Sequence, residues 1–237
     1  MRREVQKSVQ KIHFDTIDST NTYARENADY LTTPVLITAY EQTKGRGRHG
    51  KSFFSPDSGI YFSLLFEADP HFDLITPAAA VCTCKAVKEI CGIDADIKWV
   101  NDIFYNGKKV CGILTERFIS NNKTYTIVGI GINLNTETFP ADLPQAGCLG
   151  VDIDGRIIAE RVTELLLQYN SCYERENILK EYKNRLFIIG KEIDYELNGV
   201  LYSGICADIN NECNLIVKKP DGDYITLKSG EISIKVK

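Results

Sequence analysis

The chain has 237 residues, of which 43% are hydrophobic and 25% are charged, and its formal net charge is −4. This composition is ordinary for a globular protein with a real core, and the acidic balance argues against a general nucleic-acid binder, which is usually strongly basic. No apolar run is long enough to cross a bilayer, and the charged N-terminus lacks the apolar segment of a signal peptide, so we expect a cytoplasmic protein without membrane contact. The eight cysteines form no C-x-x-C pair, which favours reduced, buried thiols over a zinc site.

The first half of the chain reads as strands interrupted by two helices. A helix with Asp18 or Ser19 as its cap is expected over 18–31, and a second one over 76–92, where Pro77 stands near the start and Gly92 at the end. Apolar runs predict strands at 11–17, 34–42, 59–67 and 121–135, and a hairpin within 95–118 that turns at Asn106-Gly107. Several strands follow one another without a helix between them, which favours a mixed or antiparallel sheet with helices on one side.

In the second half of the chain, the predicted secondary structure changes from helices to short strands at Gly190. Two helices are expected before it, over 154–178 and 179–187. Five short β-rich runs follow within fifty residues, at 191–197, 200–209, 214–220, 223–229 and 232–237. They predict a small barrel. We place a domain boundary near Ile188–Gly190, which divides the chain into 1–188 and 189–237.

The segment "QTKGRGRHGKS" at 42–52 gathers positive charge around three glycines. Arg46 and Arg48 stand two residues apart and would point the same way in an extended segment, and glycines let the backbone approach a ligand closely. Such a loop can offer guanidinium and backbone N–H groups to an anion. A solvated surface loop is the alternative reading of the same charges.

Residues 45–52 also match the letters of a Walker A phosphate loop. A true phosphate loop opens a helix directly after its Lys-Ser pair. Here Pro56 and Gly59 follow and lead into a strand. We therefore reject that interpretation.

Three further segments carry polar residues where a plain core would not need them. In 98–109, Asp102 follows Asn101, a pair suited to hydrated Mg²⁺ and its phosphates, and lysines on the returning strand could reach the same point. Gly129 and Gly131 lie on one face of an apolar strand, which marks either the close approach of a ligand or a bulge. The hydroxyls of "DSTN" at 18–21 could bind a ligand or simply cap the helix.

Together, the four segments resemble the biotin protein ligases in order and spacing. The family's S-T-N, Q-x-x-G-R-G-R-x-G, K-W-P-N-D with a lysine on the next strand, and G-x-G-I-N patterns correspond here to 19–21, 42–50, 98–102 with Lys109, and 129–133. The resemblance implies an α+β fold: a mixed, largely antiparallel sheet with helices packed on it, similar to class II aminoacyl-tRNA synthetases, followed by a small SH3-like β-barrel. Val100 stands where the family usually has proline, and Phe53 where some members have a tryptophan.

The resemblance implies an ATP-dependent ligase with Mg²⁺ as its cofactor. Such an enzyme forms biotinyl-5′-AMP and then biotinylates a lysine of a biotin carboxyl carrier protein. A lipoate or octanoate ligase or transferase of the same superfamily is the alternative, and a non-catalytic nucleotide- or RNA-binding protein is the alternative from another class. Because the S-T-N pattern begins at residue 19, we expect no DNA-binding domain and no DNA partner. A homodimer is compatible with the sequence.

The resemblance also implies roles for individual residues, with the basic loop expected to be mobile until it closes over ligand. The residues expected to act in catalysis are Lys109, Arg46 and Arg48. Those expected to bind biotin are Ser19, Thr20, Asn21, Gln42, Arg46, Gly47, Arg48, Lys109, Gly112 and Gly129. Those expected to bind ATP are Arg46, Arg48, Phe53, Lys98, Asn101, Asp102 and Asn133, with Asp102 also expected to hold Mg²⁺.

Overall fold

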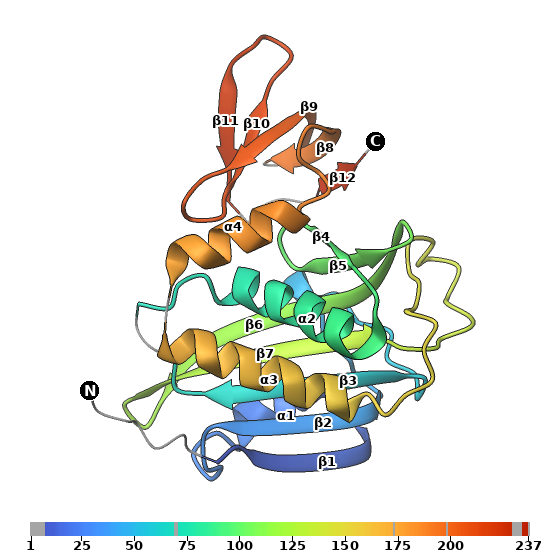
Figure 1. Ribbon diagram of the computed structural model, residues 1–237, viewed down its shortest axis with the longest axis vertical. Helices are drawn as coiled ribbons and strands as arrows, with labels where there is room; N and C mark the ends of the chain where they lie inside the picture. The colour runs from blue at the N-terminus through green and yellow to red at the C-terminus, as the bar shows by residue number, and fades with distance from the viewer. Residues whose placement is uncertain (1–7, 69–70, 173, 198, 229–233, 237) are drawn as a thin grey trace.

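A large sheet forms the body of the molecule. The computed structural model describes residues 8–68, 71–172, 174–197, 199–228 and 234–236. Seven strands lie in the order β1-β2-β3-β7-β6-β5-β4, with β1 and β2 parallel and all other neighbours antiparallel (Figure 1). Their bounds are β1 Gln10–Ile17, β2 Val35–Gln42, β3 Gly59–Phe66, β4 Asp96–Lys98, β5 Asp102–Tyr105, β6 Lys108–Ser120 and β7 Lys123–Asn133. The predicted mixed, largely antiparallel sheet is confirmed.

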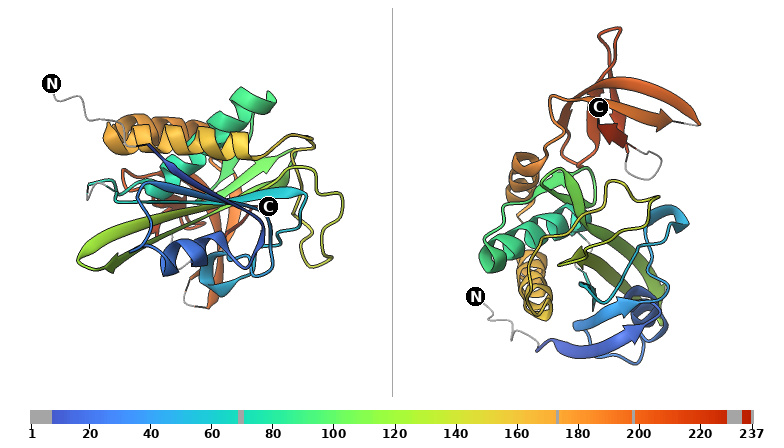
Figure 2. Two further views of the ribbon diagram at one scale, coloured as in Figure 1. Left: turned by 90° about the horizontal axis from the view of Figure 1, so that it is seen from below. Right: turned by 90° about the vertical axis from the view of Figure 1, so that its right-hand side faces the viewer.

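Helices cover both faces of this sheet, so the expectation of helices on one side is wrong. On β3, Leu64 belongs to the larger core cluster with helix α2 (Ile75–Cys91), whereas its neighbour Leu65 packs with Ala24 of helix α1 (Thr20–Glu26). Figure 2 shows α1 on the opposite side of the sheet from α2. The cause is topological, because parallel strands such as β1 and β2 need a crossover connection, and α1 supplies it.

The two helices that follow the large sheet break earlier than the sequence indicates. Helix α3 spans Arg156–Ser171 and packs beside α2, and helix α4 spans Arg175–Arg185. The predicted boundaries at 154–178 and 179–187 are therefore wrong. Both helices bury one apolar face, so the apolar period continues across the break and does not reveal it.

A second, smaller antiparallel sheet closes the chain. Its order is β11-β10-β9-β8-β12, with β8 Glu192–Leu197, β9 Val200–Ile209, β10 Leu215–Lys218, β11 Tyr224–Leu227 and β12 Ile234–Val236. The five predicted strands are present, although part of the run 223–229 and of the run 232–237 lies outside the described residues.

The two sheets meet through buried contacts. The indole Nε1 of Trp99 donates to the carbonyl oxygen of Cys213 at 2.7 Å, and the side chains of Cys206 and Leu215 belong to the same hydrophobic cluster as α2. The division into domains at 188 and 189 stays a prediction. Within the described ranges, no helix is both long and apolar enough to span a membrane.

Candidate active site

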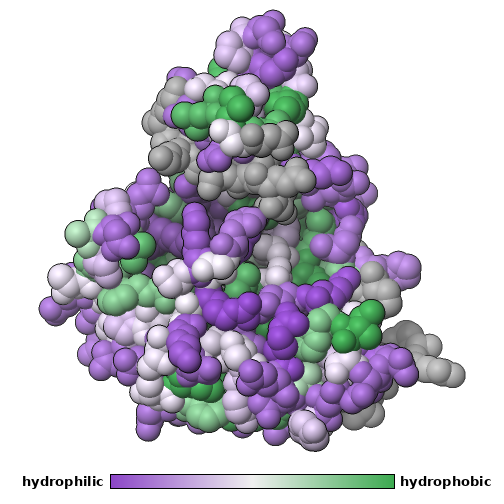
Figure 3. Space-filling model, turned by 180° about the vertical axis from the view of Figure 1, so that it is seen from behind, coloured by the Kyte–Doolittle hydropathy of each residue, from purple (hydrophilic) through white to green (hydrophobic). Residues whose placement is uncertain are grey.

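A cavity of about 820 Å³ lies on the α1 face of the large sheet. Figure 3 shows this side of the molecule, where hydrophilic side chains surround a hollow below the second sheet. Its volume is in the range of small-molecule sites. Every site residue predicted from the sequence lines it: Ser19, Thr20, Asn21, Gln42, Arg46, Gly47, Arg48, Phe53, Lys98, Asn101, Asp102, Lys109, Gly112, Gly129 and Asn133.

The basic loop between β2 and β3 folds back on itself over this cavity. Arg46 and Ser52 form an antiparallel bridge, the Gly47 amide donates to Lys51 O at 2.7 Å, and the Phe53 amide donates to Gly45 O at 2.9 Å. A Cβ at Gly45 would collide with the Phe53 carbonyl, so this close approach requires glycine. The chain after Ser52 is extended and not helical, which confirms the rejection of a Walker A loop.

Glu116 on β6 neutralises part of the loop's charge. Its carboxylate accepts hydrogen bonds from Arg46 at 3.2 and 3.3 Å, from Arg25 at 3.0 Å and from Asn21 Nδ2 at 3.0 Å. Arg46 is therefore paired within the protein, and the mobility of the loop before ligand binds stays a prediction. Neither Glu116 nor Arg25 was identified from the sequence. Each lies in a segment predicted to be a strand or a helix, where a charged residue on the exposed face is ordinary.

Arg48 enters the cavity from the other side of the loop. Its Nη1 donates to Asn101 Oδ1 at 2.9 Å, and the Asn101 amide in turn donates to Ile113 O at 2.9 Å. Burial lowers the pKa of Arg48, while the nearby Asp102 carboxylate acts in the opposite direction. A guanidinium that is partly stripped of water and fixed by an amide is prepared to bind an anion.

The two lysines that follow the hairpin turn at Asn106-Gly107 have different surroundings. Lys109 lines the cavity with its Nζ 2.7 Å from Asp102 Oδ1 and 5.9 Å from the centre of the Phe53 ring. Lys108 is not simply solvated, since its Nζ donates to Pro144 O at 2.8 Å and holds the segment that borders the cavity. Alternation along the strand explains why adjacent lysines serve different surfaces.

Trp99, Val100 and Asn101 form a turn between β4 and β5, and the Trp99–Val100 peptide is cis. The substitution of the family's proline by Val100 therefore concerns a turn and not a strand. Lys98, which precedes this turn, is half-buried, and burial lowers its pKa against the opposing effect of Asp102.

A network of neutral polar groups forms the α1 end of the cavity. Gln42 Oε1 accepts from the Thr20 amide at 2.9 Å, and Gln42 Nε2 donates to Ser55 Oγ at 3.2 Å. The Ser63 hydroxyl lies 2.8 Å from Thr20 Oγ1 and donates to Asn21 Oδ1 at 2.6 Å. Ser19 caps α1 by accepting from the Thr22 amide, which confirms the capping role. It also lines the cavity, and its binding of a ligand stays a prediction.

The glycines on the cavity floor make room for this chain's own side chains. A Cβ at Gly129 would collide with the Asn21 carboxamide, and Cβ atoms at Gly112 and Gly131 would lie 2.7 and 2.5 Å from carbons of the Phe53 ring. Phe53 and Asn21 lie against these glycines, and the expected binding of biotin at Gly112 and Gly129 stays a prediction.

One wall of the cavity was not predicted from the sequence. Phe139 and the segment 142–146 line it. Asn133 Nδ2 donates to Gly147 O at 2.8 Å just beyond this segment, while its buried Oδ1 has no hydrogen-bond donor among the described residues. The segment has no regular secondary structure and no charge pattern, so no sequence signal identifies it.

The described residues contain no group of three histidine, cysteine or acidic side chains that could hold a metal ion by themselves. Two carboxylates, those of Asp102 and Asp142, line a cavity that is also lined by several cations. This donor set fits Mg²⁺ in one respect, since that ion is commonly held by one or two carboxylates together with substrate phosphates and water.

Comparisons with known proteins agree with this geometry. The model of the biotin/lipoate A/B protein ligase family matches residues 13–133. The bifunctional ligase/repressor BirA of Bacillus subtilis is 38% identical over 56% of this chain and 42% of its own length, and the biotin–[acetyl-CoA-carboxylase] ligase of Paracoccus denitrificans is 35% identical over 56% and 55%. The chain thus covers less than half of the first of these relatives.

Solved structures extend the likeness over nearly the whole chain. The biotin protein ligase from Aquifex aeolicus in complex with biotin and ATP superposes with a TM-score of 0.81 at 26% identity, covering 96% of this chain and 99% of that one. The family model matches more than half of the sequence and spans all fifteen predicted site residues, from Ser19 to Asn133. The chain belongs to the biotin/lipoate A/B protein ligase family.

Proposed function

We propose that the protein is an ATP-dependent biotin protein ligase. The observation that carries the proposal is the convergence of Arg46, Arg48 and Lys109 on one cavity whose other end is neutral and polar. A substrate with an anionic reaction centre and a neutral hydrogen-bonding ring would match the cationic end and the neutral end of this cavity. The similarity to a ligase structure that contains biotin and ATP supports the same assignment.

In the first step, a carboxylate oxygen of biotin attacks the α-phosphorus of ATP. The bond from that phosphorus to the bridging oxygen breaks, and pyrophosphate leaves with the electron pair. Two anions repel each other as they meet, so preorganised positive charge lowers the barrier. Lys109, already adjacent to Asp102, and the two arginines of the loop supply this charge.

The ureido ring of biotin is neutral and needs hydrogen bonds without charge. Ser19, Thr20 and Gln42 at the α1 end provide hydroxyl and amide groups for it. On the nucleotide side, Asn133 Oδ1 is a buried acceptor that an amino group could satisfy, and the Phe53 ring offers a face for stacking. Mg²⁺, when bound beside Asp102, would neutralise phosphate charge.

In the second step, the amine of an acceptor lysine attacks the acyl carbon of biotinyl-5′-AMP. The bond from that carbon to the phosphate oxygen breaks, AMP leaves, and the amine loses a proton. We propose a biotin carboxyl carrier protein as the acceptor and the cytoplasm as the place of reaction. The basic loop over the cavity would shield the reactive anhydride from water.

The test is ATP-dependent release of pyrophosphate with biotin, lipoate or octanoate as the acid, followed by transfer of labelled biotin to a purified carrier domain. We expect activity with biotin and label on one lysine. Preference for lipoate or octanoate would assign the protein to the other branch of the family. Absence of pyrophosphate release with all three acids would overturn the enzymatic assignment.

A further inference from the structure

The turn formed by residues 99–101 is held by three other parts of the molecule. The indole Nε1 of Trp99 donates to Cys213 O, in the loop between β9 and β10, at 2.7 Å. The Tyr182 hydroxyl of α4 donates to Val100 O at 2.9 Å. Figure 1 shows α4 between the large sheet and the smaller one, so two neighbouring elements hold the turn from outside the large sheet.

The third residue of the turn, Asn101, carries an arginine of the basic loop. Its carbonyl oxygen accepts from the Ile113 amide and its side-chain amide donates to Ile113 O, both at 2.9 Å. These two hydrogen bonds fix the Asn101 carboxamide, whose oxygen accepts from Arg48 Nη1 at 2.9 Å. The position of Arg48 in the cavity therefore depends on the turn, and a chain of contacts runs from α4 to the basic loop.

Tyr182 is suited to hold this turn in one place. It is fully buried, and burial raises the pKa of its hydroxyl well above the usual range, so the group stays a neutral donor. Arg48 acts on this pKa in the opposite direction, which places the guanidinium near the hydroxyl. The hydrogen bond to Val100 O is itself buried, so a bond to bulk water does not replace it when the hydroxyl is removed.

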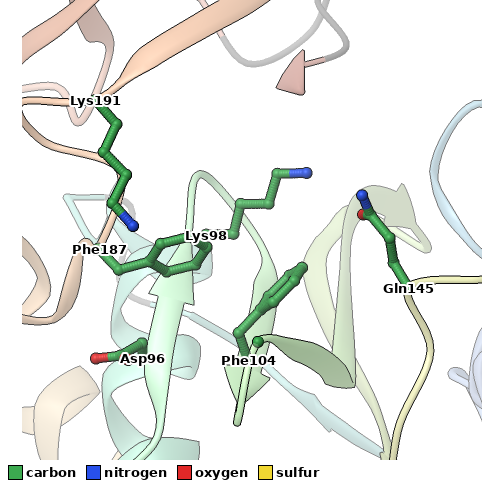
Figure 4. A pocket seen from close by; sticks show the side chains of 7 residues that line it. Asp96, Lys98, Phe104, Gln145, Phe187 and Lys191 are labelled. Carbon is green, nitrogen blue, oxygen red and sulfur yellow. The ribbon is translucent and has the colours of Figure 1, made fainter. Parts of the chain in front are cut away.

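The segment that follows α4 is tied to the strands on both sides of the turn. Leu186 forms a parallel bridge with Ile97 of β4, and the Phe187 ring lies 5.3 Å from that of Phe104 on β5. Figure 4 shows these two rings lining one small cavity together with Lys98, the residue that precedes the turn. Tyr182 therefore reaches Val100 from a helix whose place relative to the turn is fixed.

We propose that Tyr182 is a positioning residue for anion binding: through Val100 O it holds the turn that orients Asn101 and, with it, Arg48. The proposal rests on the proposed function, which takes ATP to be the anion that Arg48 binds. Tyr182 lies outside the lining of the large cavity, so its effect is exerted through the turn. A tyrosine that only filled the core would affect stability in the same way whether or not Arg48 were present.

The experiment measures the affinity of the full chain for ATP with Mg²⁺ and without biotin, by calorimetry. The variants are Tyr182→Phe, which keeps the ring and removes only the donor, Arg48→Gln, and the two combined. We expect about tenfold weaker binding for Arg48→Gln and about three- to fivefold weaker binding for Tyr182→Phe. In the Arg48→Gln background, Tyr182→Phe should have no further effect, because the group that it positions is gone.

Tyr169→Phe is the matched control. The Tyr169 hydroxyl of α3 also donates to a residue of α4, Glu181, at 3.0 Å, but Tyr169 lines neither cavity. Its loss should leave ATP binding unchanged. Trp99→Phe releases the same turn from the smaller sheet and serves if denaturant unfolding shows that Tyr182→Phe does not fold. Its loss of affinity should likewise vanish in the Arg48→Gln background.

Equal ATP affinity of wild type and Tyr182→Phe, or an equal fold-loss with and without Arg48, would overturn the positioning role. An equal loss in Tyr169→Phe, or no binding of ATP to wild type, would overturn it as well. Because calorimetry needs no turnover, the two proposals can fail separately. ATP affinity that depends on Tyr182 through Arg48, without pyrophosphate release with any of the three acids, would contradict only the proposed function.

Discussion

The Arg46 guanidinium donates two hydrogen bonds to the Glu116 carboxylate, with lengths of 3.2 and 3.3 Å. Arg46 is therefore bound to an internal anion, and a substrate carboxylate or phosphate must compete with Glu116 for it. Arg46 is 43% exposed, so solvent screens the pair and its strength is at most about 1 kcal/mol. We expect Glu116→Gln to lower the KM for the anionic substrates by up to about fivefold and to leave kcat nearly unchanged.

Arg25 supplies a control of opposite sign. It shares the Glu116 carboxylate at 3.0 Å, so its removal leaves that carboxylate more available to Arg46. Arg25→Gln should raise the same KM values about twofold. Steady-state kinetics of both variants decide the point. Changes in the same direction would mean that Glu116 positions Arg46 productively and does not compete for it.

Lys109 should be the most sensitive side chain for adenylate formation. It contacts Asp102 inside the cavity, and its ammonium can stabilise charge that develops on the phosphoryl oxygens. Lys109→Met should lower the rate of pyrophosphate release by about 10²–10³ under single-turnover conditions, the typical loss for one preorganised contact. Lys108→Met is the control and should remain near wild type. A larger loss of rate in Lys108→Met would show that the hydrogen bond from Lys108 to Pro144 O at the edge of the cavity matters more than Lys109.

Local signals in the sequence predicted most of the fold. Asn106 and Gly107 both take positive φ, 48° and 72°. Asn-Gly is the dipeptide that such hairpin turns prefer, so this turn could be predicted from two adjacent residues. The cap of α1 at Ser19 could be predicted in the same way, because capping depends on a few adjacent residues. The candidate segments stood out because glycines, lysines and amides occur within apolar strands, and the resemblance to the biotin protein ligases implied the roles of their residues.

Partners distant in the chain could not be predicted. Glu116 meets Arg46 across 70 positions and Arg25 across 91, and nothing in a strand pattern identifies which charges will meet. The neighbours of Gly112 and Gly129 could not be predicted for a related reason. A glycine indicates that something approaches closely, but the sequence does not say whether it is a ligand or, as here, Phe53 and Asn21.

Buried thiols should make the fold sensitive to alkali. Burial raises the pKa of Cys206 and of Cys213 from 9.0 to about 12. Between these values the folded state holds protons that the unfolded state has lost, so stability is full below pH 9 and falls as pH rises toward 12. The slope approaches about 1.4 kcal/mol per pH unit for each thiol.

Denaturant unfolding under reducing conditions at pH 8, 9.5 and 10.5 measures this effect. Cys206→Ala should show a shallower decline than wild type, whereas replacement of the exposed Cys172 by alanine should leave the slope unchanged. Identical slopes for Cys206→Ala and wild type would contradict the assignment.

Gly129 should be the least replaceable glycine of the cavity floor. A Cβ there would collide with the Asn21 carboxamide, which Ser63 and Glu116 hold by hydrogen bonds. Because Asn21 cannot move without breaking both, Gly129→Ala should cost about 1–3 kcal/mol of unfolding free energy and weaken biotin binding. Gly112→Ala should cost less, since the half-buried Phe53 ring that it meets can shift.

The double variant Gly129→Ala/Asn21→Ala provides the decisive comparison. Asn21→Ala alone removes hydrogen bonds, but in the Gly129→Ala background it also removes the collision. The two substitutions should therefore be less than additive, with a coupling of about 1 kcal/mol or more in denaturant unfolding. Strict additivity would mean that the alanine at position 129 is accommodated by movement of the strands, and that Asn21 is not what requires glycine there.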